Sequence, residues 1–189
     1  MKDSNCLKKE GHESGYCLIE GIVVMLMDMQ DRFVKKLRLK EAERIILISK
    51  QLTILGLCRQ FNIPVIVSEI RKDLHGATIK ILMDEAKKNT QFHLISKENN
   101  NGFSGTDLDP YLKSICGKKL FFMGINDYAC IKHTAESSIK NGYEIMTSKD
   151  VISGPYYRVD DKIDQWFKSE GTCFGSIEEF MKFIQSLKT

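Results

Sequence analysis

Short apolar runs recur along the chain, separated by segments whose apolar residues have helical spacing. A continuously apolar run such as residues 21–27 is typical of a parallel strand buried on both faces. The spacing of apolar residues within 41–61 indicates instead a helix with one buried face. The pattern predicts strands at residues 21–27, 65–68, 92–95, 120–123, 143–147 and 172–175, helices at 41–61, 77–88, 106–115, 159–168 and 177–187, and a helix that contains Cys130 and stops at Gly142.

Strands that alternate with helices predict an α/β fold. We expect a three-layer, Rossmann-like arrangement with helices on both faces of a six-stranded, mostly parallel sheet. The chain has 189 residues, 42% of them hydrophobic, so one domain over residues 20–189 is expected. Residues 1–19 are polar and are expected to form a flexible arm, and residues 150–157, DVISGPYY, are expected to form a loop after the fifth strand.

Composition excludes several classes of partner. The formal net charge of +3 is spread along the chain, without the block of like charge that a nucleic-acid surface needs. Six irregularly spaced cysteines form no C-x-x-C pair, which predicts mostly buried free thiols in a reducing compartment. The first twenty residues lack the apolar segment of a signal peptide, and the longest apolar run, residues 22–27, is too short to cross a bilayer. A cytoplasmic protein with no nucleic-acid or membrane partner is therefore expected.

Reactive side chains follow three of the predicted strands at their carboxyl ends. Asp28 follows the first strand, Lys97 the third, and Cys130 follows the fourth after a short turn. In open α/β sheets, ligands bind outside the carboxyl ends of the strands, so we expect these side chains to meet in one site. Taken singly, each has a plainer explanation: a helix cap for the aspartate, a surface position for the lysine and core packing for the cysteine.

An acid, a cation and a thiol at one edge predict nucleophilic catalysis. Cys130 is expected in the first turn of its helix, where unpaired N–H groups and the helix dipole lower the thiol pKa. Asp28 is expected to accept the thiol proton and return it to a leaving amine, while Lys97 balances the charge. Backbone N–H groups of residues 125–130 are expected to bind a developing oxyanion.

Three segments together resemble the isochorismatase-like cysteine hydrolases, the superfamily that contains nicotinamidases and N-carbamoylsarcosine amidase. They are VVMLMDMQDRF (residues 23–33), SKENNNGFSGTDLDPYL (residues 96–112) and GINDYACIKHTAESSIKNGYEIMTSKD (residues 124–150). Their order and spacing fit the family from residue 21 to about residue 154. By this resemblance, Asp28, Lys97 and Cys130 align with the family's catalytic triad.

The resemblance implies further features of the site. The family places a cis peptide in the turn before the nucleophile, which here is the Ile125–Asn126 bond. Its oxyanion hole corresponds to the backbone amides of Asn126 and Cys130. The resemblance also implies a homo-oligomer.

Three aromatic residues are candidates to form the wall of a substrate pocket. Phe33 and Phe103 lie near Asp28 and Lys97 in the sequence, and Tyr128 lies two residues before Cys130. Ordinary core packing explains each of them equally well.

Three departures limit what the resemblance carries over. Asp127 stands where the family usually has threonine, and a carboxylate pointing inward there raises the pKa of Cys130. Asp73 and His75 form an Asp-x-His motif, but it is displaced from the family's metal-binding position and no second histidine is nearby. We therefore expect no metal or other cofactor, because divalent sites usually recruit three protein ligands. The region after Gly154 matches no particular subfamily.

The leading hypothesis is a metal-independent cysteine hydrolase that acts on a small amide or carbamoyl compound through a thioester. Isochorismatase-type hydrolysis of a small non-amide substrate is an alternative, although the family's isochorismatases typically lack the cysteine and the retained Cys130 favours amide chemistry. A second alternative is a non-catalytic binding or scaffold protein that has kept the fold. A third is redox sensing, in which another cysteine forms a disulfide with Cys130.

Overall fold

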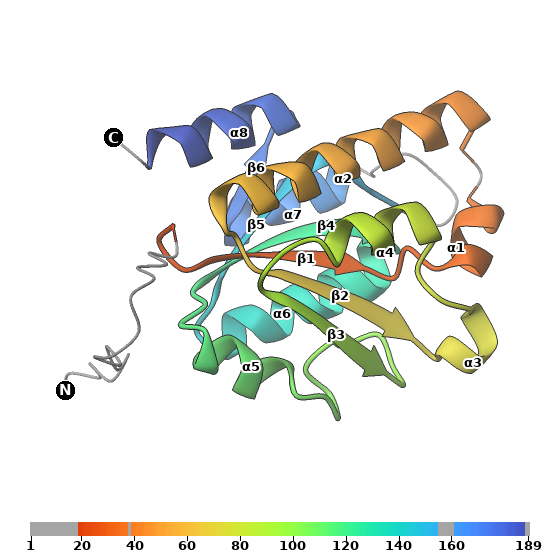
Figure 1. The fold of residues 1–189 in the computed structure, drawn as a ribbon, viewed down its shortest axis with the longest axis horizontal. Helices are drawn as coiled ribbons and strands as arrows, with labels where there is room; N and C mark the ends of the chain where they lie inside the picture. The colour runs from red at the N-terminus through yellow and green to blue at the C-terminus, as the bar shows by residue number, and fades with distance from the viewer. Residues whose placement is uncertain (1–18, 38, 155–160, 188–189) are drawn as a thin grey trace.

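Strand β1 (Ile22–Met27) lies in the middle of the sheet, and all six of its side chains are buried. The computed structural model describes residues 19–37, 39–154 and 161–187. In this part of the chain every strand pair is parallel, and the strand order is β3-β2-β1-β4-β5-β6 (Figure 1). The other strands are β2 (Val65–Ile70), β3 (Phe92–Lys97), β4 (Lys119–Ile125), β5 (Glu144–Ser153) and β6 (Thr172–Phe174). The predicted six-stranded parallel sheet is confirmed.

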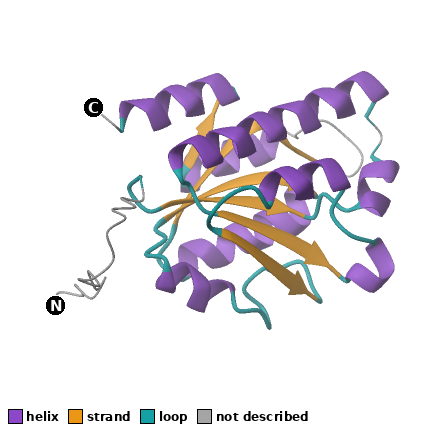
Figure 2. Ribbon diagram, in the orientation of Figure 1, coloured by secondary structure: helices purple, strands orange, loops and turns teal. Residues whose placement is uncertain are grey.

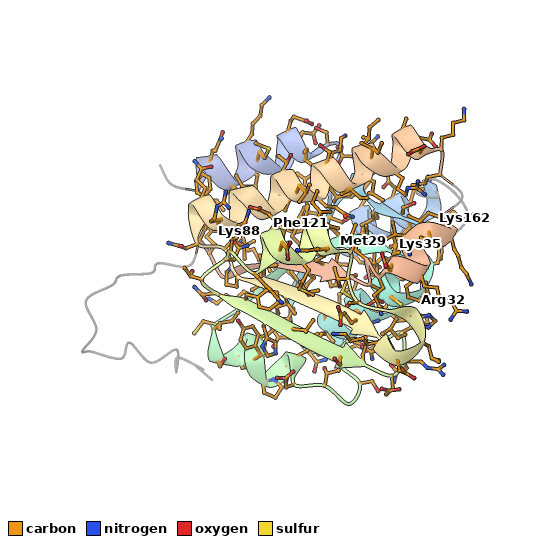
Figure 3. The ribbon with its side chains drawn as sticks, turned by 45° about the vertical axis from the view of Figure 1, so that its right-hand side comes forward. Met29, Arg32, Lys35, Lys88, Phe121 and Lys162 are labelled. Carbon is orange, nitrogen blue, oxygen red and sulfur yellow. The ribbon has the colours of Figure 1, made fainter. Side chains whose placement is uncertain are left out.

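Helices cover both faces of the sheet, which forms the central layer in Figure 2. Side chains of α2, α4 and α8 pack on one face, together with Met29 and Phe121, which Figure 3 labels. Side chains of α5, α6 and α7 pack on the other face. The helices of the described chain are α1 (Asp31–Lys36), α2 (Glu41–Phe61), α3 (Lys72–His75), α4 (Lys80–Ala86), α5 (Leu108–Ser114), the π-helix η1 (Asp127–Ile131), α6 (Lys132–Lys140), α7 (Asp161–Glu170) and α8 (Ile177–Ser186). None of them is long and apolar enough to cross a membrane.

The strand order reverses between β1 and β4. From β1 the chain continues outward to β2 and β3, then returns to β4 on the other side of β1 and continues to β5 and β6 (Figure 1). The connections therefore leave β1 and β4 in opposite directions at their carboxyl ends, which opens a crevice there. This topological switch point is where the site forms.

The structure differs from the sequence-based expectations at several places. The predicted loop at 150–157 is wrong for residues 150–153, because β5 continues to Ser153 after a register shift opposite Phe122 and Gly124. Val151 and Ile152 are buried in that extension. Helices α1 and α3 were not predicted, since six and four residues are too few to show a helical period. Most of the predicted N-terminal arm and the start of the predicted helix at 159–168 lie outside the described residues.

Candidate active site

Asp28 follows β1 directly and is completely buried. Its backbone turns into a left-handed conformation, with φ of 51°, and its N–H donates to the carbonyl of Ser68 on β2 at 3.1 Å. The hydroxyl of Ser68 donates to one carboxylate oxygen of Asp28 at 2.7 Å. The ammonium of Lys97 donates to the other oxygen at 2.7 Å. Two strands therefore hold the carboxylate in one orientation.

Lys97 is the last residue of β3, and its ammonium group is also completely buried. β3 does not neighbour β1 in the sheet, so the side chain extends past β2 to reach Asp28. A buried charge is costly unless it is paired, and each of these two residues neutralises the other. Lys97 also donates to the backbone carbonyl of Asn100, at 3.4 Å.

Cys130 lies in the π-helix η1, which follows β4 after one left-handed residue, Asn126 (φ 64°). π-Helical turns are rare and are often found at functional sites. The thiol is 2% exposed, and its sulfur lies 3.5 Å from the Oδ1 of Asn100, which accepts its hydrogen bond. It is also in side-chain hydrogen-bonding contact with Asp28 and Lys97. The structure thus brings together the three side chains that the sequence predicted to meet.

The charge state of Cys130 differs from the prediction. Burial, followed by the negative charge of Asp28, raises the pKa of this thiol to about 12, and the positive charge of Lys97 only partly opposes them. The predicted lowering of the pKa is therefore wrong for the free site. Cys130 is not in the first turn of a regular α-helix but in a short, buried π-turn, where desolvation outweighs any dipole. At neutral pH the resting residue is a thiol.

The turn before Cys130 depends on a glycine and on a left-handed asparagine. A Cβ atom on Gly124 (φ 135°) would lie 2.1 Å from the carbonyl oxygen of Met27, so only glycine lets β4 approach the end of β1 this closely. The Ile125–Asn126 bond is trans, since no peptide bond between described residues is cis. The expected cis peptide is therefore wrong, and the left-handed conformation of Asn126 redirects the chain instead.

Asn100 is a site residue that the sequence analysis missed. Its side-chain oxygen accepts from the Cys130 thiol, and its backbone carbonyl accepts from both Lys97 and the hydroxyl of Thr134 at 3.2 Å. It lies in the run NNN, where turn propensity was the only signal and nothing distinguished it from its neighbours. One loop residue thus contacts two members of the cluster.

A cavity of about 420 Å³ opens beside Cys130 at the carboxyl edge of the sheet. Its lining comes from α1, from the segments after β2 and β3, and from the turn after β4. The lining residues are Phe33, Ile70, Arg71, His75, Glu98, Asn99, Asn100, Asn126, Ala129 and Cys130. Phe33, predicted as a wall residue, is among them and stacks on His75 with ring centroids 4.3 Å apart.

The structure does not bring the other two predicted wall aromatics to this cavity. Phe103 packs beside Tyr143, with ring centroids 5.9 Å apart, against the core on the α5–α6 side of the sheet. Tyr128 is 40% exposed, and the ammonium of Lys132 lies 5.9 Å from its ring. The direction in which η1 turns could not be read from the spacing to Cys130.

The carboxylate of Asp127 accepts a hydrogen bond from the backbone N–H of Tyr128 at 2.8 Å. It also faces Gly154, where a Cβ atom would lie 2.9 Å from it. Burial and the charges of Asp28 and Lys97 are the largest influences on the pKa of Cys130.

Of the two residues of the displaced Asp-x-His motif, only the histidine lies at the site. His75 lines the cavity, whereas Asp73 is exposed on α3. No group of three histidine, cysteine or acidic residues in the described chain lies close enough together to hold a metal ion. The absence of a metal in the working protein stays a prediction.

Three cysteines in the described chain, Cys58, Cys130 and Cys173, are free thiols. Burial raises the pKa of Cys58 and raises that of Cys173 to about 12. Cys116 is disulfide-bonded and is the exception among the described cysteines to the predicted mostly free thiols.

A buried cysteine, aspartate and lysine lie together at the switch point of a parallel α/β sheet. The family model described as "Isochorismatase domain" matches residues 22–162, about three quarters of the chain. The chain therefore belongs to the isochorismatase-like hydrolase family.

A curated relative, isochorismatase family protein 2A of Dictyostelium discoideum, is 24% identical over 134 residues. The match covers 69% of this chain and 65% of that relative, so the chain spans just under two thirds of its length.

Several solved structures share the fold. The MAR1 ribonuclease of Caenorhabditis elegans has a TM-score of 0.75 at 15% identity, covering 90% of each chain. N-Carbamoylsarcosine amidase of Thermoplasma acidophilum has a TM-score of 0.66 at 19% identity, covering 80% of this chain and 94% of its own. YcaC of Escherichia coli, described as an octameric hydrolase of unknown specificity, has a TM-score of 0.71 at 17% identity, covering 87% of this chain and 79% of its own. At these identities the likeness concerns the fold.

Proposed function

We propose that this protein is a cysteine-dependent hydrolase of a small amide or carbamoyl compound, acting through a covalent thioester. One observation carries the proposal: the Cys130 thiol contacts a buried Asp28–Lys97 pair at the edge of a cavity. Such a pair offers a thiol no packing advantage, whereas it supplies the base and the counter-charge that a nucleophile needs.

The raised pKa of Cys130 decides how the nucleophile is activated. Because the resting group is a thiol, its proton must leave as the sulfur attacks the carbonyl carbon, and Asp28 accepts it. Before the transfer, the Asp28 carboxylate is the negative group beside the Lys97 ammonium. After the transfer, Asp28 is a neutral carboxylic acid and the Cys130 thiolate is the negative group. The buried cluster therefore keeps the same net charge throughout, which avoids the cost of an unpaired charge in the interior.

The reaction then proceeds in two stages, formation of the thioester and its hydrolysis. As the carbon–sulfur bond forms, the carbonyl electron pair moves to oxygen, and the backbone N–H groups of Asn126 and Cys130 are proposed to bind this oxyanion. When it collapses, the carbon–nitrogen bond breaks and Asp28 returns its proton to the leaving ammonia or amine. Water, deprotonated by Asp28, then attacks the thioester and releases the acid and the thiol.

The cavity volume of about 420 Å³ supports a small-molecule substrate. An amidase of the same fold, that for N-carbamoylsarcosine, supports carbamoyl or amide chemistry. The fold alone does not select it, because a ribonuclease shares the architecture. We also propose a homo-oligomer, supported by the octameric YcaC.

Replacement of the nucleophile tests this function. Cys130→Ala and Cys130→Ser are expected to lower ammonia release from a panel of small amides by about 1,000-fold or more, with an unchanged circular dichroism spectrum. Cys173→Ser, which removes a free thiol on β6, is the matched control and should keep full activity. Wild-type turnover retained in the Cys130 variants would refute the mechanism, and no turnover by the wild-type protein on any amide would favour the scaffold alternative.

A further inference from the structure

Two oppositely charged side chains line the cavity without forming an ion pair with each other. Arg71 follows β2, Glu98 follows β3, and both are exposed residues that line the cavity beside Cys130. Neither side chain forms an ion pair or a side-chain hydrogen bond with another described residue. The proposed chemistry uses neither of them, so their place in the cavity wall calls for a separate explanation.

The position of Arg71 is fixed by the sheet edge. Its backbone is in the left-handed conformation (φ 41°, ψ 63°), which is unfavourable for a residue with a Cβ atom. Its N–H donates to the carbonyl of Lys97 at 2.9 Å, so the residue is tied to the end of β3. The backbone of Arg71 is thus held at the cavity wall, while the Lys97 ammonium is already neutralised by Asp28.

A second cation, Arg32, does not line the cavity, but its charge acts on the lining residue His75. Arg32 projects from α1, on the right-hand side of Figure 3, and its guanidinium donates to the carbonyl of Leu74 at 2.8 Å. Burial lowers the pKa of His75, and the charges of Arg32 and Arg71 lower it further, by more than Asp73 and Asp28 raise it. His75 is therefore neutral at pH 7 and adds no positive charge of its own to the cavity.

We propose that the substrate carries an anionic group, such as a carboxylate, and that Arg71 binds it while Cys130 attacks the amide carbon. This inference rests on the proposed hydrolase function and names the substrate class. A guanidinium presents planar, paired donors that match a carboxylate, and Arg32 adds to the attraction. Glu98, on the loop after β3, opposes this attraction, so its neutralisation is expected to strengthen the binding of an anion.

Alkylation of Cys130 tests the proposal without any turnover. Iodoacetate and iodoacetamide both form a carbon–sulfur bond with Cys130 and release iodide, but only iodoacetate carries a negative charge. The ratio of their alkylation rates at Cys130, measured at pH 9 by mass spectrometry, shows whether the cavity attracts or repels an anion. Cys173 in the same sample is the internal reference.

Arg71→Gln is expected to lower the iodoacetate-to-iodoacetamide ratio at Cys130 by about threefold to tenfold, since it removes one unit charge from the wall of the same cavity. Arg71→Lys should retain most of the ratio, and Glu98→Gln should raise it. Arg59→Gln makes the same change of net charge on α2, remote from the cavity, and should leave the ratio unchanged. An unchanged ratio in Arg71→Gln would overturn the proposal.

Paired substrates provide the second readout. Succinamate and succinamide are matched amides of which only the first has a carboxylate, and Arg71→Gln should raise KM for succinamate with little change in kcat. A preference for the neutral amide in the wild-type protein would overturn the anionic substrate while leaving the cysteine mechanism intact. Turnover retained after loss of Cys130 would refute the mechanism itself, so the two failures are distinguishable.

Discussion

Two Lys–Asp pairs with nearly equal separations lie in this molecule, and they have different surroundings. Lys97 and Asp28 are 2.7 Å apart and fully buried, whereas Lys50 and Asp150 are 2.6 Å apart with 31% and 16% of their side chains exposed. Both pairs join residues far apart in the sequence. Lys50 and Asp150 themselves line a cavity of about 510 Å³, whereas the first pair has the Cys130 thiol beside it.

The hydrogen bonds of the second pair explain its structural role. The Asp150 carboxylate accepts from Lys50 on α2, from the hydroxyl of Ser148 and from the first N–H of α8, at Ile177. It thereby joins α2, β5 and α8, and it complements the amino-terminal end of α8. The hydrogen bonds that the Asp150 carboxylate accepts all stabilise the fold, whereas the Asp28 carboxylate contacts the Cys130 thiol, which can give up a proton. The groups that surround an ion pair, rather than its N···O distance, therefore indicate a catalytic role.

The largest expected difference between the pairs concerns their carboxylates. Asp28→Asn should lower hydrolysis by about 100-fold to 10,000-fold, because it removes the proposed base. It should also lower the free energy of unfolding by about 3–5 kcal/mol, because it leaves Lys97 charged and buried without a partner. Asp150→Asn should cost about 1 kcal/mol and keep activity. Urea denaturation and an ammonia-release assay measure both effects; equal losses in the two variants would contradict the distinction.

A second prediction concerns the pH dependence of Cys130 alkylation. With a pKa of about 12, the rate of reaction with iodoacetamide should rise about tenfold per pH unit up to pH 10, without a plateau. The negative charge of Asp28 raises this pKa, so Asp28→Asn should lower it and increase the rate at pH 8, by about tenfold for one pKa unit. Asp150→Asn should leave the profile unchanged. A wild-type plateau near pH 8 would show that the resting site is a thiolate.

A smaller difference is expected for the serines that support each carboxylate. Ser68→Ala removes a buried hydrogen bond to Asp28, and we expect a loss of about 1–3 kcal/mol in stability with a several-fold lower kcat. Ser148→Ala removes the equivalent bond to Asp150 and should reduce stability alone. Comparison of kcat between the two variants separates positioning of the base from packing. Equal kcat values in the two variants would mean that Ser68 does not orient Asp28.

The smallest effect is expected for Asp127→Asn. This carboxylate accepts a hydrogen bond from the N–H of Tyr128 and faces Gly154, and an asparagine oxygen can accept the same hydrogen bond. The alkylation profile of Cys130 should therefore match that of the wild-type protein. A shift of the profile to lower pH would show that Asp127 does raise the thiol pKa.

The sequence was sufficient to predict the parallel α/β sheet and the meeting of Asp28, Lys97 and Cys130. Buried parallel strands need apolar residues on both faces, so runs such as residues 22–27 mark them locally. The carboxyl ends of these strands lie on one edge, and therefore the residues after them can be grouped without coordinates. The family resemblance agreed with that grouping, and the family model confirmed the membership.

The local pattern of apolar and polar residues did not predict the features that depend on an interaction with a distant segment. The extension of β5 to Ser153 depends on a register shift against β4, and the contact of Asn100 with Cys130 joins residues thirty positions apart. The partners of Phe103 and Tyr128 likewise follow from the course of the chain around the site.

The pKa of Cys130 shows most clearly what tertiary structure decided. Position in a helix predicted a lowered value, but burial and the charge of Asp28, which is 102 residues away, raise it. Residue types and their order determine which groups can meet, because secondary structure follows local periodicity. How far water is excluded, and which charges face one another, depends on packing between segments, and these two quantities set the protonation state.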